Sequence, residues 1–336
     1  MKASQIITLG LATLVGTTFV AQAQEAAQGP KMEAVVQFGN KKPTKIAIDK
    51  ASGKGKFIFT DTTSQQQMEY PVAQCKTFML QSPADFLLAS RLYRAGKLEP
   101  AVARLASVKN KYKNFVGLPG NPSTEAALMQ VMAQIRLQDW AGLKSTLASF
   151  PEPNMVEAYQ KPLLLVAGFL AVEDAEAASK LEAIQALLDK KADVDKLDLD
   201  VYGLLRLAQA RGLAAQIPAA EWEAGLSEAS AATASIAADY YCQAAMAMHG
   251  ANPELVAYCM TSAAKLLWAT PQSKSYLATL SGAKTCSPAQ WTGAPGNFKD
   301  AAALAKMAQG IFGAAADEAT AAIGAYYVNP NVPAAQ

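Results

Sequence analysis

The side chains with the greatest capacity for chemistry are a single histidine and four cysteines. The histidine, His249, follows Cys242 by two turns of a stretch with helical periodicity. A rise of about 1.5 Å per residue separates the two by roughly 10 Å along the helix axis. A nucleophile and its base need hydrogen-bond reach, so this pair does not suit catalysis. His249 instead precedes Gly250 at a predicted helix end, where the dipole stabilises a partly positive imidazole. We predict that no residue is catalytic and that the protein is not an enzyme.

The cysteines are Cys75, Cys242, Cys259 and Cys286, an even number that permits disulfides in an exported chain. Helices are predicted over 237–249 and 253–268, and the turn between them places Cys242 and Cys259 level. Packed helices with inward-facing cysteines bring their Cα atoms to about 3.4–5.4 Å, which overlaps the disulfide range of about 4.4–6.8 Å. We therefore predict a Cys242–Cys259 disulfide. Two reduced thiols, or a bond from Cys259 to Cys286, remain the alternatives, and the pairing of Cys75 and Cys286 is open.

The densest acidic cluster is Asp193–Asp200. A calcium loop starting at its first residue needs a glycine sixth and a glutamate twelfth, where this chain has Asp198 and Leu204. The cluster instead predicts a helix N-terminus near 198–200, where carboxylates stabilise free N–H groups. The chain contains no C-x-x-C pair, phosphate-binding glycine loop, dinucleotide fingerprint or hydrolase elbow. We therefore expect no metal and no cofactor.

The first residues have the pattern of an export signal. Met1-Lys2 is a short positive start, Ile6–Val20 is mostly apolar, and Ala21-Gln22-Ala23 is a cleavage site of the small-x-small type. We predict a signal peptide over 1–23 and an exported protein, periplasmic or secreted. The next long apolar run, Leu163–Val172, is too short to span a bilayer.

Export also argues against nucleic acid as a partner. Lys109, Lys111 and Lys113 flank Tyr112 in a pattern that suits phosphate and base. Lysines are equally common at a helix C-terminus, and we place these there. The aromatic residues Tyr240, Tyr241 and Trp268 occur at helical spacing among alanines and are predicted to be core.

Residues 31–82 differ from the rest of the chain. Short β-like runs alternate with turn signals at Gly39-Asn40 and Gly53, which predicts a small antiparallel sheet or barrel that packs on the following helices. The segment is basic, with lysines at 31, 41, 42, 45, 50, 54, 56 and 76 against four acidic residues. These lysines either contact an anionic polymer of the cell envelope or keep the sheet soluble and unpaired.

Helical periodicity begins after Ser82 and Pro83, predicted as the cap and the first position of a helix. An apolar helix ends at Gly96, and an amphipathic helix follows at once. The stretch resembles a tetratricopeptide repeat on five positions, Tyr93, Gly96, Leu98, Ala101 and Leu105. Breaks between paired helices recur at intervals of roughly 35–42 residues, as in helical-repeat proteins. A second unit has Trp140 after its break, but Gln138 stands where a glycine is expected.

We therefore predict a mainly α chain, an α-solenoid of antiparallel helix pairs preceded by the small sheet. The predicted layout is a flexible lead (24–30), the β segment (31–82), helical repeats (83–283), an irregular loop (284–297), a helical cap (298–327) and a disordered tail (328–336).

The resemblance implies a non-enzymatic scaffold that binds a protein partner. It also implies that the first helix of each pair lines the binding surface, here 84–95, 122–137, 154–172, 197–211 and 237–249. The alternative is a module that binds cell-wall polymer or carbohydrate with the basic β segment.

Overall fold

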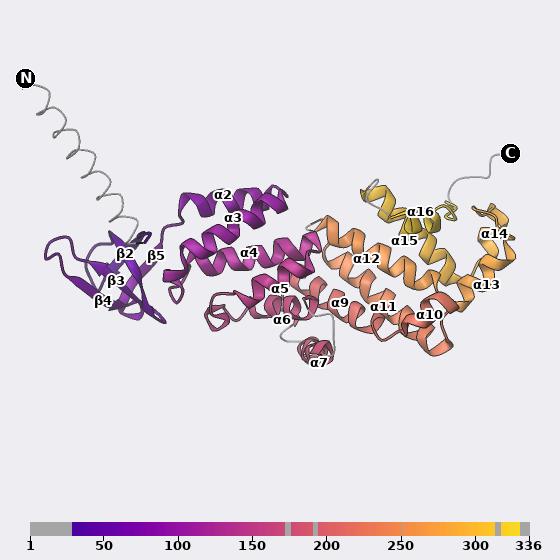
Figure 1. Ribbon diagram of the computed structural model, residues 1–336, viewed down its shortest axis with the longest axis horizontal. Helices are drawn as coiled ribbons and strands as arrows, with labels where there is room; N and C mark the ends of the chain where they lie inside the picture. Colours follow the sequence, from indigo (N-terminus) through magenta and orange to yellow (C-terminus); the bar gives the residue numbers. More distant parts are fainter. Residues whose placement is uncertain (1–28, 172–175, 191–193, 251, 313–316, 330–336) are drawn as a thin grey trace, which may run out of the picture. The chain divides into compact units, whose positions relative to one another are not determined.

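The computed structural model describes residues 29–171, 176–190, 194–250, 252–312 and 317–329 (Figure 1). The predicted signal peptide, most of the flexible lead, most of the C-terminal tail and Asp193 lie outside the described residues. The chain divides into two compact units, which are described separately. The first contains the chain up to Ala133 together with Ser149–Val156, and the second contains Gln134–Ala148 and the chain from Glu157 onward.

A five-stranded antiparallel sheet begins the first unit. Its strands follow the order β4-β3-β2-β1-β5 and have the bounds β1 Met32–Phe38, β2 Thr44–Gly53, β3 Lys56–Thr60, β4 Gln67–Pro71 and β5 Cys75–Leu80. Alternate residues of β1 are buried, among them Ala34 and Val36, so one face of the sheet forms core. The predicted antiparallel sheet is therefore confirmed.

The buried face of the sheet packs on the first helices, as predicted. Helix α2 (Ala84–Arg94), helix α3 (Leu98–Lys111) and the 3-10 turn η2 (Lys113–Phe115) share one hydrophobic core with the strands. Phe57 and Phe115 are fully buried in it. The backbone of β2 approaches the loop after η2 so closely that a Cβ on Gly117, whose φ is 101°, would lie 2.9 Å from the Gly53 carbonyl oxygen. Only glycine fits there.

The hairpin around Gly96 forms as the sequence indicates. Gly96 takes the left-handed conformation at φ 71°, and its N–H donates to the Tyr93 carbonyl at 3.0 Å. Leu98, Ala101 and Leu105 of α3 are buried, which explains their spacing. The predicted serine cap is wrong: α2 begins at Ala84 with Pro83 in the cap position, and no side chain caps it.

The second unit is helical throughout its described part. Helix α4 (Pro122–Leu137) runs from the first unit into it. Its other elements are α5 Trp140–Ala148, α6 Lys161–Leu170, α7 Glu176–Leu188, α9 Leu199–Ala214, α10 Ala219–Ala224, α11 Glu228–Ala247, α12 Pro253–Trp268, α13 Pro271–Thr279, α14 Pro288–Gly293, α15 Gly296–Phe312 and α16 Glu318–Gly324. The 3-10 turn η3, Pro153–Met155, belongs to the first unit.

Successive long helices pack side by side in this unit. Helix α11 packs on α9, α12 packs on α11, and α15 packs on α12 (Figure 1). Small residues line these contacts, since Ala237, Ala244, Ala263 and Ala305 are all fully buried. A mainly α chain of packed helix pairs, preceded by a small sheet, is therefore the observed architecture.

The C-terminal part corrects one prediction. The stretch predicted as an irregular loop contains α14, which Ser287 starts with a capping box to Gln290. A separate cluster of aromatic residues follows, in which the ring of the fully buried Phe298 lies 4.9 Å from that of Trp268 and 5.7 Å from that of Tyr326. Trp268 is therefore part of a core, as predicted, and so is the buried Tyr241.

Candidate functional site

The main candidate site is a groove on the C-terminal helices. Helix α12 packs on both α11 and α15, so it forms the floor and the other two helices form the walls. The groove has a volume of about 470 Å³. We call it the methionine groove, and its lining residues are Cys242, Ala245, Met246, His249, Met260, Leu304 and Met307.

Helix periodicity explains why three of these side chains meet. Cys242 and Met246 are one turn apart on α11, and His249 follows after a further three residues. The helix ends at Ala247, and the His249 N–H donates to the Met246 carbonyl at 3.4 Å, which keeps His249 beside the last turn. Cys242 and His249 therefore line the same groove, although sequence analysis separated them along a single continuous helix.

The methionines give the groove its character. Met246 is 78% exposed and Met307 is 50% exposed, whereas Met260 on the floor is buried. Exposed apolar side chains around a hollow are typical of binding surfaces. Methionine is flexible and polarisable, so it adapts to partners of different shape. Sequence analysis missed these residues because the wall from α15 comes from a distant part of the chain.

Acidic groups lie close to the groove. Burial raises the pKa of the Cys242 thiol to about 11, and the carboxylates of Asp239 and Asp300 add to the rise. The thiol is therefore protonated at neutral pH, which is unlike a catalytic cysteine. Both acidic side chains are exposed, so they give the rim of the groove a negative character.

The predicted disulfide is wrong in this structure. All four cysteines are free, including Cys242 and Cys259 and the alternative partner Cys286. The physical reason is orientation: Cys242 lines the groove between α11 and α15, whereas Cys259 is completely buried. Burial raises the pKa of the Cys259 thiol far above its ordinary value, and nearby Cys242 adds a smaller effect. Helix α12 has the predicted bounds, and α11 ends close to the predicted turn although it begins earlier, at Glu228. The prediction of a disulfide fails on the direction of Cys242, which lines the groove.

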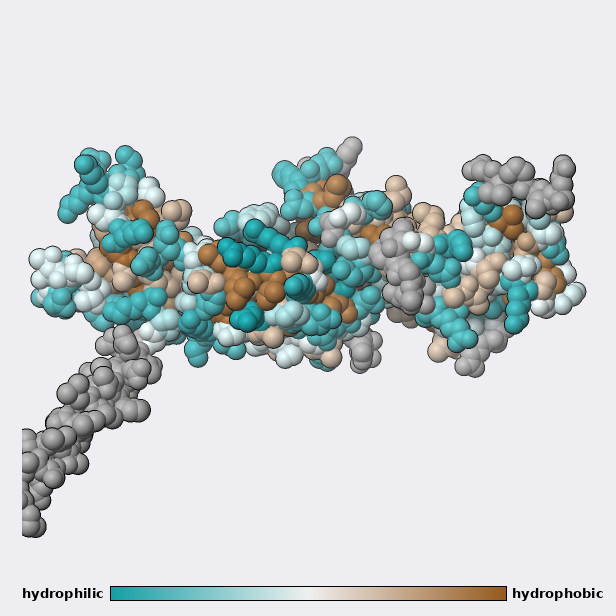
Figure 2. Space-filling model, turned by 90° about the horizontal axis from the view of Figure 1, so that it is seen from above, coloured by the Kyte–Doolittle hydropathy of each residue, from teal (hydrophilic) through white to brown (hydrophobic). Residues whose placement is uncertain are grey.

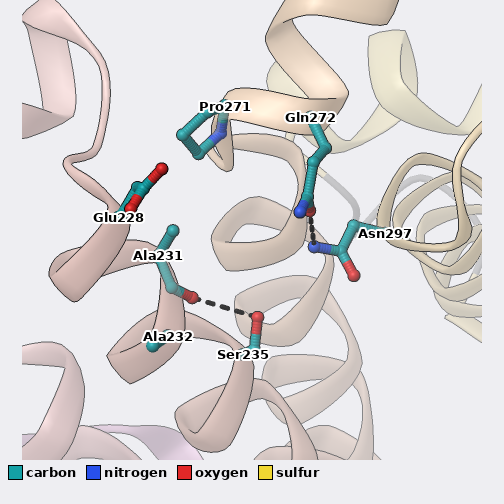
Figure 3. Close-up of a pocket in the computed structure, with 7 residues that line it drawn as sticks. All are labelled: Glu228, Ala231, Ala232, Ser235, Pro271, Gln272 and Asn297. Atoms are coloured by element: carbon teal, nitrogen blue, oxygen red, sulfur yellow. Dashed lines mark hydrogen bonds between the residues drawn. The ribbon is translucent and has the colours of Figure 1, made fainter.

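A second, polar groove of about 540 Å³ lies where α11, α13 and α15 begin (Figure 3). Three of its four polar side chains bond within the protein. Asn297 donates its side-chain N–H to the Gln272 amide oxygen at 2.8 Å, and the Ser235 hydroxyl donates to the Ala231 carbonyl at 3.0 Å. We therefore assign this groove a structural role at the junction of three helices.

The acidic cluster singled out in the sequence has a structural role. Helix α9 begins at Leu199 with Asp198 in the cap position, which confirms a helix N-terminus in the acidic cluster, although the Asp198 side chain makes no cap bond. Among the described residues, no three His, Cys, Asp or Glu side chains lie close enough to hold a metal ion. No described helix is long and apolar enough to cross a membrane.

The lysines singled out in the sequence bond within the protein. The buried Lys109 donates to the Ser149 hydroxyl at 2.9 Å, and Lys111 pairs with Asp85 at 2.7 Å. In the basic sheet, Lys31 pairs with Asp49 at 3.0 Å and Lys56 pairs with Glu69 at 3.2 Å. These contacts favour a structural role for part of the basic charge.

Two further features concern the repeat-like positions. Trp140 begins α5 and lies under the guanidinium of Arg211, 4.5 Å from it.

On the first unit, apolar surface gathers over α2 and α3 in the space-filling view (Figure 2). Leu87 and Leu88 of α2 are 45% and 41% exposed.

Comparison with known proteins leaves the function to be argued from these sites. No family model, no curated protein and no solved structure matches this chain.

Proposed function

We propose that this protein is an exported scaffold, similar to tetratricopeptide-repeat proteins, that binds a protein partner in the methionine groove. The observation that carries the proposal is the pair of exposed thioether side chains, Met246 and Met307, on opposite walls of an apolar hollow. One wall is α11, whose second half belongs to the segment 237–249 that the repeat resemblance implies as a binding helix. Apolar walls suit binding better than hydrolysis, which would need polar groups converging on His249.

The groove and its rim indicate what the partner presents. A volume of about 470 Å³ falls within the range of ligand pockets and accommodates one or two large side chains. Asp239 and Asp300 carry negative charge close to Cys242, so a basic residue beside the apolar anchor is complementary. We therefore propose a peptide segment with a large apolar anchor next to lysine or arginine.

The energy of such a contact follows from burial. Covering an exposed apolar side chain contributes about 1.5–3 kcal/mol, and two methionines are available in the groove. Ordering the peptide costs part of this gain. With the apolar anchor of the peptide as a third buried side chain, the gain is about 4.5–9 kcal/mol before that cost, so we expect an affinity between millimolar and micromolar. Binding should weaken modestly as salt is added, because the rim charges are exposed.

A displayed peptide library, selected on the purified protein, tests the proposal. Selected peptides should share the anchor-plus-basic pattern, and their binding can be measured by fluorescence anisotropy. Met246→Glu and Met307→Glu should each weaken binding at least tenfold, because each places a charge in the apolar contact. Met79→Glu is the matched control, since Met79 is 54% exposed on β5 in the other unit.

Two outcomes would overturn the proposal. One is a peptide affinity that neither Met246→Glu nor Met307→Glu changes. The other is a protein that selects no peptide but binds an anionic envelope polymer in a salt-sensitive manner, which would favour the basic sheet as the binding element. Export is tested separately by the intact mass of the protein recovered from cells, which should lack residues 1–23.

A further inference from the structure

The methionine groove contains an unusual collection of soft donor atoms. Three thioethers, from Met246, Met260 and Met307, share its lining with the thiol of Cys242 and the imidazole of His249. Thioether and thiolate ligands select Cu(I) over harder divalent ions, and imidazole also binds copper. Five such donors around one hollow of about 470 Å³ amount to more soft-metal ligands than an apolar contact requires.

Helical spacing and the shared lining place these donors around one hollow. Cys242 and Met246 occupy adjacent turns of one face of α11, where Cβ atoms lie about 5–6 Å apart, and Met246 is also one turn from His249. Met260 comes from the floor and Met307 from the opposite wall. Methionine has three rotatable bonds in its side chain, so its sulfur can move toward an ion at the centre of the groove.

The electrostatic surroundings favour a cation. The carboxylates of Asp239 on α11 and Asp300 on α15 are close enough to disfavour the charged form of the Cys242 thiol. The same negative potential stabilises a positive ion beside that sulfur. Met246 and Met307 are exposed, so an ion can enter without opening the helical core.

We propose that the methionine groove binds one Cu(I) ion through the Met246 thioether, the Cys242 sulfur and a methionine of a facing helix, with His249 at the open end. On binding, the Cys242 S–H bond breaks, its proton passes to solvent, and the sulfur lone pair forms the bond to copper. No electron is transferred, and Cu(I) remains Cu(I). The site goes beyond the proposed docking role and does not depend on it.

The test is a titration of the full reduced chain with Cu(I), without oxygen, in competition with a coloured Cu(I) chelator. Cys75→Ser and Cys286→Ser are first introduced, because these partly exposed thiols outside the groove would add background binding, whereas Cys259 is fully buried. One tightly bound ion per chain is expected, with release of one proton on binding. Ag(I), which is redox-inert, should compete with it, and Zn(II) should not.

Leucine substitutions distinguish the contribution of the thioether sulfur to binding from that of the apolar side-chain volume. Met246→Leu and Met307→Leu keep the groove apolar but remove a thioether, and Met246→Leu should weaken Cu(I) binding at least tenfold. Cys242→Ser should weaken it as strongly and should abolish the proton release. Met79→Leu, an exposed methionine on β5, is the matched control and should change nothing.

X-ray absorption at the copper edge should show sulfur neighbours in the parent protein. The proposal is overturned if the chain binds no Cu(I) under these conditions, or if Met246→Leu and Cys242→Ser bind it as tightly as the parent. The leucine variants retain the apolar lining, so they should still bind a selected peptide. Failure of the metal site and failure of the docking site therefore give different results.

Discussion

A glycine in the middle of α9 provides a sharp test of how the second unit is packed. Replacing a glycine with alanine inside a helix ordinarily stabilises it by about 0.5–1 kcal/mol, because the backbone loses less entropy on folding. At Gly203 the opposite is expected. A Cβ there would lie 2.6 Å from Cγ of Met248, and 3.2 Å from both the Ala244 carbonyl oxygen and the Ala247 Cβ. All three atoms belong to α11 or the residue that follows it.

The neighbours of Gly203 have little freedom to move. Met248 is fully buried, and the Ala244 carbonyl belongs to the backbone of α11. Overpacking of this kind costs about 1–3 kcal/mol. After the helical gain is subtracted, Gly203→Ala should lose up to about 2.5 kcal/mol. For a unit of roughly 200 residues, that loss lowers the melting temperature by up to about 10 °C.

The matched control is Gly310→Ala on α15. Gly310 is exposed, and a Cβ built on it meets no atom within 4 Å, so only the helical gain applies. The melting temperature of the Gly310→Ala variant, followed by circular dichroism at the helix band, should rise by about 1–4 °C. If Gly203→Ala also raised the melting temperature, α9 and α11 would not be as close as the structure has them. A Gly203→Ala/Met248→Ala double variant should lose less than the sum of its parts, because the clash is shared.

Three further perturbations test other parts of the fold. Gln138→Gly should raise the free energy of unfolding, measured in urea, by about 0.5–1 kcal/mol, because Gln138 holds φ at 57°, where most side chains are strained; a lower free energy of unfolding would contradict this. Hydrogen bonding from Lys265 lowers the pKa of Asp317, so its charge stabilises the fold above about pH 3.8, and this stability is lost as the pH falls through the lowered value. Asp317→Asn, which can still cap α16, should therefore lower the melting temperature slightly at pH 7 and by less at pH 3; an equal effect at both would exclude the charge as the cause. Phe298→Ala should cost about 3–5 kcal/mol in urea unfolding, because Phe298 is fully buried among aromatic rings; a loss below 1 kcal/mol would be incompatible with that core.

The predictable features were those determined by local chemistry. Alternation of apolar residues located the strands, and Gly96 located the first helical turn, because only a residue without a Cβ enters the left-handed region at low cost. Gln138 adopts the same left-handed conformation although it is not a glycine. Its φ is 57°, and its N–H donates to the Ile135 carbonyl at 3.0 Å. Ile135 before the turn and Leu143 after it are fully buried, so the break was predictable from apolar spacing even though the residue type argued against it.

Two predictions fail for different reasons, one because it depends on side-chain direction and the other because a local signal was overlooked. The turn between α11 and α12 lies where it was predicted, yet the disulfide does not form, because Cys242 lines the groove while Cys259 is enclosed in the core. Helix α14 was missed because prolines and glycines around Trp291 suggested a loop, although Ser287 and Gln290 form a capping box. A capping box is readable from sequence, so this second failure could have been avoided.

The methionine groove shows why a site of this kind escapes sequence analysis. Alanines make up most of the buried residues of α11 and α15, which lets these two helices approach their neighbours closely. The groove occurs where α11 and α15 present methionines and Cys242 instead, and each helix supplies only part of the lining. The spacing of Cys242, Met246 and His249 is visible in the sequence, but it is also the spacing of an ordinary core stripe. Only the position of Met307, which α12 brings opposite Met246, distinguishes a binding groove from a buried face.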